Sequence, residues 1–208
     1  MSNLKPILFN TAMVQAILDG RKTTTRRIIK VDSKLNFIGF GVEPKEIKNT
    51  ATFGHGSFED VVNCKVENHI KAPYLPGDIL YVRETFAKIC DVCEKECIGC
   101  NKKYAYKADN NHTEEDKWKP SIHMPKEAAR IFLKVTDVRV ERLQDIDYEG
   151  CKNEGVKAGY DGWLGEWSSL WDSTVNKKDI DKYRWKANPY VWVIEFLKID
   201  KSDIGMVK

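Results

Sequence analysis

Residues 20–27 read GRKTTTRR, which places four cationic side chains and three threonines in eight positions. The preceding residues, 12–19, have the apolar spacing of an amphipathic helix that Thr11 can cap. Gly20 is a suitable residue to end that helix. The threonine run is β-branched and favours extended backbone. We therefore expect an exposed junction between a helix and a strand, with its backbone fixed on both sides.

Strand patterns dominate the rest of the chain. Segments with strand character are KPILFN (5–10), ILYVRETF (79–86), KYAYKAD (103–109), ARIFLKVTDVRVERL (129–143) and NPYVWVIEFLKI (188–199). Helical patterns cover residues 145–157 and GEWSSLWDSTV (165–175). Residues 32–72 show weak periodicity and are expected to form a variable loop region with one hairpin. This order predicts an α+β fold, mostly β, built as a small, partly closed β-barrel with outer helices.

Length and charge restrict the class of protein. The 208 residues are 42% hydrophobic, which is enough for a core within one domain. With 34 basic and 31 acidic residues, the net charge of +3 excludes a uniformly basic nucleic-acid coat but permits a local basic patch. No run approaches the roughly 20 apolar residues of a membrane helix, and the first ten residues lack the apolar core of a signal peptide. We expect a cytoplasmic protein with no membrane partner.

Four cysteines in CDVCEKECIGC follow the spacing C-x2-C-x3-C-x2-C. They are Cys90, Cys93, Cys97 and Cys100. Four thiolates around one tetrahedral ion form a structural zinc site, which leaves no position for a catalytic water. An iron–sulfur cluster and four free or oxidised thiols are the alternatives. We expect structural zinc, no organic cofactor, and a hairpin insertion over 88–103 pinned by the metal. The isolated Cys64 and Cys151 are expected to serve as small apolar residues.

The motif GRKTTTRR contains the groups needed for nucleophilic chemistry. The Thr25 hydroxyl is a poor nucleophile until a base takes its proton. Lys22 can be that base only if its pKa falls from about 10.4 toward 7, through burial or through the neighbouring Arg21, Arg26 and Arg27. The negative end of the preceding helix opposes this shift. In an extended segment Thr25 and Arg27 share a face, so Arg27 can bind a phosphate or an oxyanion. The alternative is a solvated basic turn.

Gly20, Lys22, Thr25 and Arg27 spell G-x-K-x-x-T-x-R, and with this motif the chain resembles the ASCH domains of the PUA-like superfamily. The segments PGDILYVRETF, YKAD, WKPSIHMPKEAARIFLKVTDVRVERLQDI and NPYVWVIEF look like the ASCH proteins of bacteriophages and prophages. The resemblance covers nearly the whole chain and implies a single PUA-like domain over residues 1–208. It also implies a nucleoside or single-stranded RNA as the partner.

The resemblance carries three possible functions. Characterised bacterial relatives are amidohydrolases that remove the acetyl group from acetylcytidine with a lysine, a threonine and a glutamate. Residue by residue, these correspond to Lys22, Thr25 and Glu154, the last lying in DIDYEGCKNEGV. Other ASCH proteins are ribonucleases, and the wider superfamily binds RNA or modified bases. Amide hydrolysis of acylated cytidine, non-catalytic binding and ribonuclease action therefore all remain open.

Further polar residues are expected to bind the substrate beside the catalytic three. The full set is Arg21, Arg26, Arg27, Glu84, Ser121 and His123. Glu84 either points into the same pocket or pairs with Arg83 or a neighbouring strand. His123 is either a base or a hydrogen-bonded loop residue.

The six tryptophans can either stack on nucleobases or pack in the core. Trp118 and Trp185 have cationic neighbours in the sequence and are the candidates for stacking on a base. Trp167, Trp171 and Trp192 lie on apolar faces and are expected to be core residues.

Overall fold

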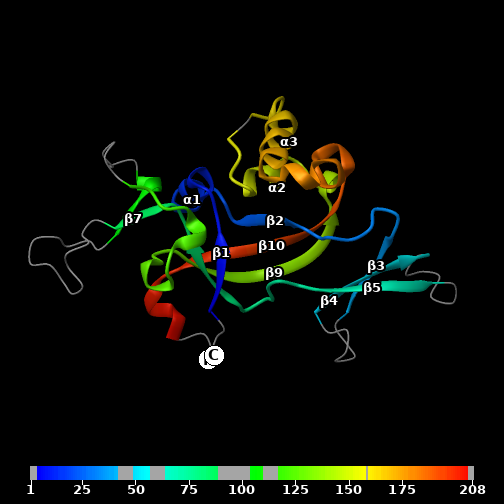
Figure 1. The fold of residues 1–208 in the computed structure, drawn as a ribbon, viewed down its shortest axis with the longest axis horizontal. Coiled ribbons are helices and arrows are strands. Elements are labelled where there is room, and N and C mark those ends of the chain that lie inside the picture. The colour runs from blue at the N-terminus through cyan, green and yellow to red at the C-terminus, as the bar shows by residue number, and fades with distance from the viewer. Residues whose placement is uncertain are drawn as a thin grey trace, which may run out of the picture. The chain divides into compact units, whose positions relative to one another are not determined.

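The structure is a computed structural model and describes residues 4–41, 49–56, 64–88, 104–109, 117–157 and 159–205. Its strands are β1 (Leu4–Leu8), β2 (Thr24–Ile28), β3 (Asn36–Gly41), β4 (Thr50–His55), β5 (Lys65–Lys71), β6 (Ile79–Arg83), β7 (Phe86–Lys88), β8 (Tyr104–Tyr106), β9 (Phe132–Arg142) and β10 (Tyr190–Ile199) (Figure 1). The helices are α1 (Thr11–Leu18), α2 (Tyr148–Asn153), α3 (Trp163–Thr174) and α4 (Ile180–Tyr183). None of the helices described is long and apolar enough to span a bilayer.

The chain divides into two compact units. The first unit comprises residues 1–22, 77–134 and 197–208, and the second comprises residues 23–76 and 135–196. The boundary after Lys22 falls inside the GRKTTTRR stretch, so Lys22 belongs to the first unit and Thr25 to the second.

In the first unit, β1 pairs in parallel with β6, and β6 pairs antiparallel with the first residues of β9. The short strands β7 and β8 form a separate antiparallel pair. A core of mostly apolar side chains fills this unit. Its buried members are Ile79, Phe86, Tyr104, Met124, Ala128, Ala129 and Phe132.

Helix α1 confirms the amphipathic pattern of residues 12–19, because Val14, Ala16 and Ile17 are buried. The predicted cap, Thr11, is wrong by one residue. Asn10 is the N-cap, and its side chain accepts a hydrogen bond from the Met13 N–H at 2.9 Å. Thr11 is instead the first helical residue, since the Asn10 side chain can satisfy the free N–H group at this end.

The C-terminus of α1 fixes the start of the motif. Gly20 has φ +75°, a left-handed conformation that glycine adopts without a steric penalty. Its N–H donates to the Ile17 carbonyl at 3.1 Å, and the Arg21 N–H donates to the Ala16 carbonyl at 2.9 Å. These two bonds are the Schellman pattern of a helix end. The Lys22 N–H also donates to Ala16, at 3.0 Å, so the backbone is held up to this lysine.

In the second unit, β2 pairs antiparallel with β10, which also neighbours β9. Strands β3, β4 and β5 form a three-stranded sheet. The prediction of a loop region with one hairpin over 32–72 was therefore wrong in extent. Glycine and charged residues obscured the alternation, yet the three strands gain regularity by pairing along β4, whose residues 50–54 are buried.

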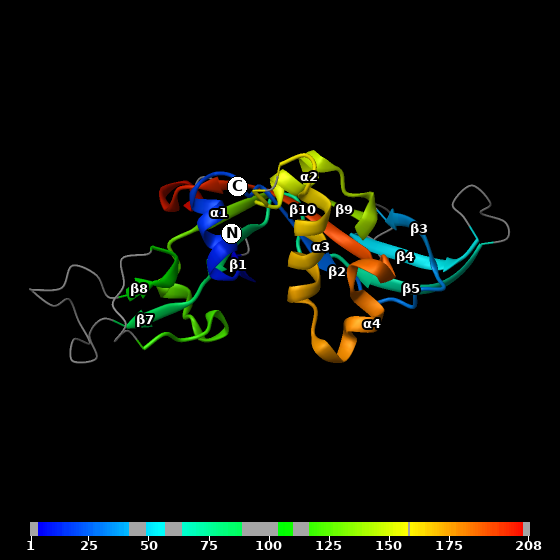
Figure 2. The same ribbon diagram turned by 90° about the horizontal axis from the view of Figure 1, so that it is seen from above.

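Helices α2 and α3 pack against β10 in the second unit (Figure 1). The buried side chains of this contact are Leu143, Ile146, Cys151, Trp167, Trp171, Val175, Val191 and Val193. The Trp167 and Trp171 rings lie 6.0 Å apart, and Trp192 is also buried, which confirms all three as core residues. Helix α4 follows the C-terminal end of α3 (Figure 2).

The observed class is α+β with mostly strands, as predicted. The predicted partly closed barrel is not seen, because the sheets of the described residues do not close. Strand β2, for example, has β10 as its neighbour on one side and forms the edge of its sheet. The predicted insertion over 88–103, with Cys90, Cys93, Cys97 and Cys100, lies outside the described residues except for Lys88.

Candidate functional site

The side chains of the GRKTTTRR stretch are more buried than a basic turn requires. Lys22 is 2% exposed, Thr25 4% and Arg26 7%, whereas Arg21 and Arg27 are partly exposed. The alternative of a solvated turn is therefore wrong for Lys22, Thr25 and Arg26. Burying polar and charged groups costs free energy unless partners compensate, so each of these positions needs a physical account.

Lys22 lies in the first unit directly after the end of α1. Its Nζ is 5.6 Å from the centroid of the Phe9 ring, within the range of a cation–π contact. The neighbouring Gly20 turn fixes the backbone, as described above. The amine is therefore placed by a rigid element and an aromatic ring, not by a mobile loop.

Thr25 and Arg27 lie on β2 in the second unit, opposite Ile194 and Trp192 of β10. The Thr23 N–H anchors the start of this segment by donating to the Asn153 carbonyl at 2.9 Å. Residues two apart on a strand share a face, so the predicted pairing of Thr25 with Arg27 on one face follows from the register.

Burial lowers the pKa of Arg27, while the charges of Tyr74 and Glu154 oppose that effect. The guanidinium still remains a cation at neutral pH, because arginine cannot be deprotonated there. Arg27 thus offers a partly buried positive charge on the same face of β2 as the Thr25 hydroxyl.

Arg26 joins β2 to two carboxylates. Its Nη1 lies 3.2 Å from Oε1 of Glu154 and its Nη2 lies 3.1 Å from Oε2 of Glu141. The side chains of Arg26 and Glu154 are 3% and 2% exposed, and that of Glu141 is 23% exposed. Within the described residues the Nε–H of Arg26 has no hydrogen-bond partner. This arrangement holds the Glu154 carboxylate in one place through a buried charge-assisted contact.

Glu154 is the C-cap of α2, and its own N–H donates to the Gly150 carbonyl at 3.0 Å. Glu141 comes from β9, and sequence reasoning missed its contact with Arg26 because the two residues are separated by 115 positions. The predicted substrate-binding residue Arg26 thus contacts two carboxylates of the protein itself. The described residues include no hydrogen bond between the Thr25 hydroxyl and Glu154.

Cys151, one turn before Glu154, is buried in the core of the second unit. Burial first, and then the charges of Glu154 and Glu166, raise the pKa of the Cys151 thiol to about 11. The thiol therefore stays protonated near neutral pH and is a poor nucleophile. This confirms the expected role as a small apolar residue. Cys64 is partly exposed.

Glu84 lies in the first unit and is 1% exposed. Its two carboxylate oxygens accept hydrogen bonds from Nε and Nη2 of Arg130 at 2.9 and 3.0 Å. Arg130 also donates to Asp109 at 2.9 Å and lies 3.9 Å over the Tyr106 ring. Burial raises the pKa of Glu84, and the contact with Arg130 opposes the rise. The paired alternative is therefore observed, with Arg130 as the partner and not Arg83.

Ser121 and His123 form a 3-10 turn in the first unit, with His123 exposed and Ser121 partly exposed. Arg83 holds this turn by donating to the carbonyls of Met124, at 2.9 Å, and Ile122. Trp185 packs against the core of the second unit, and its backbone N–H donates to the Asp172 carboxylate at 2.6 Å. Trp118 is partly buried.

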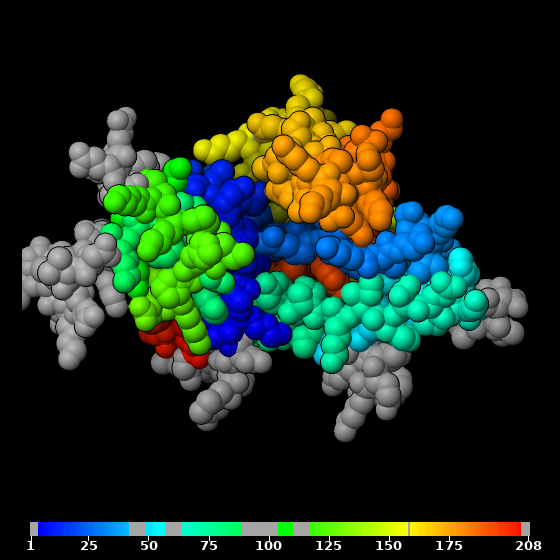
Figure 3. All heavy atoms as spheres, viewed as in Figure 1, coloured from blue at the N-terminus to red at the C-terminus, as the bar shows by residue number. Residues whose placement is uncertain are grey.

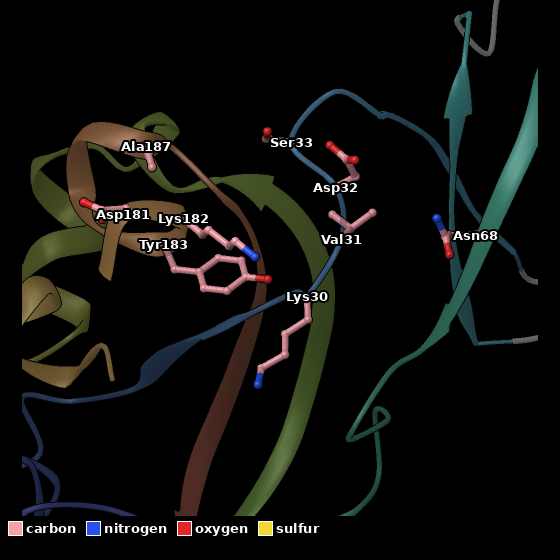
Figure 4. Close-up of a pocket in the computed structure, with 9 residues that line it drawn as sticks. All are labelled: Lys30, Val31, Asp32, Ser33, Asn68, Asp181, Lys182, Tyr183 and Ala187. Atoms are coloured by element: carbon pink, nitrogen blue, oxygen red, sulfur yellow. The ribbon is translucent and has the colours of Figure 1, made fainter. Parts of the chain in front are cut away.

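A pocket of about 710 Å³ lies in the second unit (Figure 4). It is lined by Lys30, Val31, Asp32, Ser33, Asn68, Asp181, Lys182, Tyr183 and Ala187. None of the predicted site residues lines this pocket. Little in the sequence indicates this pocket, because its lysines, aspartates and tyrosine come from separate segments without a shared motif.

The part of the chain that the structure describes holds no cluster of three or more potential metal ligands. The zinc prediction concerns cysteines outside this part and stays a prediction. No family model, curated protein or solved structure matches the chain.

Proposed function

We propose that the chain binds a nucleobase at its G-x-K-x-x-T-x-R motif and hydrolyses the amide of acylated cytidine. The single observation behind the proposal is the burial of Lys22, Thr25 and Glu154, which are 2%, 4% and 3% exposed. Lysine and glutamate are rarely buried to this extent, so buried ionisable side chains are candidates for a functional site. The resemblance to ASCH amidohydrolases supplies the reaction.

The reaction assigns one step to each residue. The proposed reaction requires Lys22 in its neutral form as the base for the Thr25 hydroxyl, whose oxygen attacks the carbonyl carbon of the acyl group. Arg27 stabilises the negative charge that develops on the carbonyl oxygen. The bond from the carbonyl carbon to the cytosine amine then breaks, and the proton that Lys22 took reaches the leaving amine through Glu154. Water hydrolyses the acyl ester on Thr25, which releases the carboxylic acid and restores the hydroxyl.

Arg26 supports the proposal as a positioning residue. It holds Glu154 at 3.2 Å through a buried contact, so the carboxylate cannot swing into solvent. It does not contact the substrate in this proposal. Glu141 accepts a second hydrogen bond from Arg26, at 3.1 Å.

The test is release of cytidine from acetylcytidine by the purified chain, followed by chromatography. Thr25→Val removes the hydroxyl at nearly constant volume, and Thr25→Ser keeps a hydroxyl. We expect loss of at least about 100-fold in kcat for Thr25→Val and for Lys22→Met, and retained activity for Thr25→Ser. Lys34→Ala, at an exposed lysine beyond the motif, is the control and keeps the wild-type rate.

Labelled RNA in the same assay separates the alternatives. Binding without product would indicate a module that recognises RNA or a modified base. Cleaved RNA would indicate a ribonuclease. Either outcome, with no cytidine released by the wild type, would refute the amidohydrolase proposal.

A further inference from the structure

The pocket of the second unit has two main walls. One wall is the segment after β2, from Lys30 to Ser33, and the other runs from Asp181 to Ala187 around α4, with Asn68 of β5 near the first (Figure 4). In the space-filling view, the orange surface of the α3–α4 region borders the blue surface of the chain after β2 (Figure 3). The volume of about 710 Å³ lies within the roughly 300–1,000 Å³ typical of ligand sites.

Both walls are tied to regular elements. The Nε1–H of Trp171 in α3 donates to the Tyr183 carbonyl at 2.8 Å. On the other side, the Ile29 N–H donates to the Tyr190 carbonyl of β10 at 2.9 Å, directly before Lys30. One point of each wall, at Tyr183 and directly before Lys30, is therefore anchored to a regular element.

The pocket carries two lysines and two aspartates, and among the described residues neither aspartate forms an ion pair with a pocket lysine. Asp32 accepts a hydrogen bond from the Lys34 N–H at 2.9 Å, and Asp181 lies 3.9 Å from Arg184. In the ranges that the structure describes, the contacts of both carboxylates are to their own segments and not to Lys30 or Lys182. Lys30 and Lys182 are exposed, and neither forms an ion pair with any residue that the structure describes. Two ammonium groups from different walls are consequently available to an anion.

The neighbouring groups suit a phosphate ester. The Lys30 and Lys182 amines and the Tyr183 hydroxyl project into the same space between the walls (Figure 4). The Asn68 amide and the Ser33 hydroxyl add hydrogen-bonding groups at the rim. Lysine, serine, asparagine and tyrosine side chains are the usual partners of phosphate oxygens in nucleic-acid complexes.

We propose that this pocket binds the phosphodiester backbone of single-stranded RNA, with Lys30 and Lys182 each contacting a phosphate. An anionic strand that crosses the pocket meets one lysine on each wall. The choice of RNA rests on the proposed function at the motif, but the anionic chemistry rests on the pocket alone. The consequence is that the acylated cytidine is presented as part of an RNA strand.

The experiment measures the binding of a short fluorescent single-stranded RNA by anisotropy over a series of salt concentrations. The variant Lys30→Ala/Lys182→Ala is compared with the full-length wild type. Single strands release about 0.7 counterions per neutralised phosphate, so losing two contacts makes the slope of log K against log salt shallower by about 1.4. Both lysines are exposed, and the variant is therefore expected to unfold at the wild-type temperature.

The matched control is Lys177→Ala/Lys178→Ala, which removes the same charge from two exposed lysines outside the pocket. Its slope is expected to equal that of the wild type. An equal loss of slope in both double variants, or no loss in the pocket variant, would overturn the proposal.

Hydrolysis of acetylcytidine by the wild-type chain separates the two proposals. If the wild type releases no cytidine while the pocket variant alone loses slope, the amidohydrolase proposal fails and the RNA pocket is supported. If cytidine is released but the slopes of the two double variants match, only the pocket proposal fails.

Discussion

Removing the Arg26 guanidinium tests the charge network behind the candidate site. In Arg26→Met the Glu154 carboxylate keeps its place in the interior, where its side chain is 2% exposed, but loses the cation 3.2 Å away. Breaking a buried pair from one side costs up to about 3–5 kcal/mol of unfolding free energy, because the carboxylate loses its charge-assisted contact, although the Arg27 charge still acts on it. The measurement is urea unfolding followed by tryptophan fluorescence. We expect the free energy of unfolding of Arg26→Met to fall by an amount within this range.

Arg21→Met is the matched control from the same stretch. The pair of Arg21 with Asp19 is short, at 2.9 Å, but its side chains are 31% and 53% exposed. Solvent screens such a pair, so the free energy of unfolding of the variant is expected to fall by less than about 1 kcal/mol. If Arg26→Met lost no more than Arg21→Met, the reasoning from burial would be refuted.

A double variant isolates the cause. Arg26→Met/Glu154→Gln removes the cation and the buried negative charge together, so it should be more stable than Arg26→Met alone. A coupling of about 1–3 kcal/mol is expected for residues in direct contact. Purely additive losses would show that the two side chains act independently.

Three further predictions concern single residues. Gly20→Ala is expected to lower the free energy of unfolding by about 1 kcal/mol, measured by thermal unfolding. The φ angle is +75° and no atom lies near the added methyl group, so backbone strain is the only cost. An unchanged free energy of unfolding would contradict the left-handed turn. At pH 8.5, peptide mass spectrometry is expected to show that iodoacetamide modifies Cys64 before Cys151. Burial raises the pKa of the Cys151 thiol to about 11, which keeps it unreactive. Equal rates of modification would refute the burial of Cys151. Burial and the hydrogen bond to Glu127 raise the pKa of Tyr104 to about 12. The stability that comes from its neutral phenol is present below pH 10 and is lost as the pH rises through 12. The free energy of unfolding of Tyr104→Phe should therefore fall less between pH 10 and 12 than that of the wild type. The same fall in both proteins would contradict the raised pKa of Tyr104.

The local patterns were reliable where one segment carried its own signal. The apolar spacing of α1, the glycine after it and the β-branched run of β2 each depend on neighbouring residues, and all three are observed. The long strand β9 was also evident, since its apolar residues form a continuous strand pattern. In contrast, β3, β4 and β5 were missed, because their regularity comes from pairing with one another and not from their own composition.

The candidate site shows the same division. The sequence alone singled out Lys22, Thr25 and Glu154, because a motif and a family resemblance are local properties of the chain. Their burial could not be read from a stretch so rich in charge, since charge favours solvent unless distant partners compensate.

Only the tertiary structure decided what those partners are. Glu141 and Glu154 reach Arg26 across 115 and 128 positions, and the pocket gathers Lys30, Asn68 and Lys182 from three separate segments. The sequence by itself therefore determined which groups are available for chemistry. The packing of α2, β2 and β9 determined which charges are paired in the interior, because electrostatic compensation depends on distance in space and not on distance along the chain.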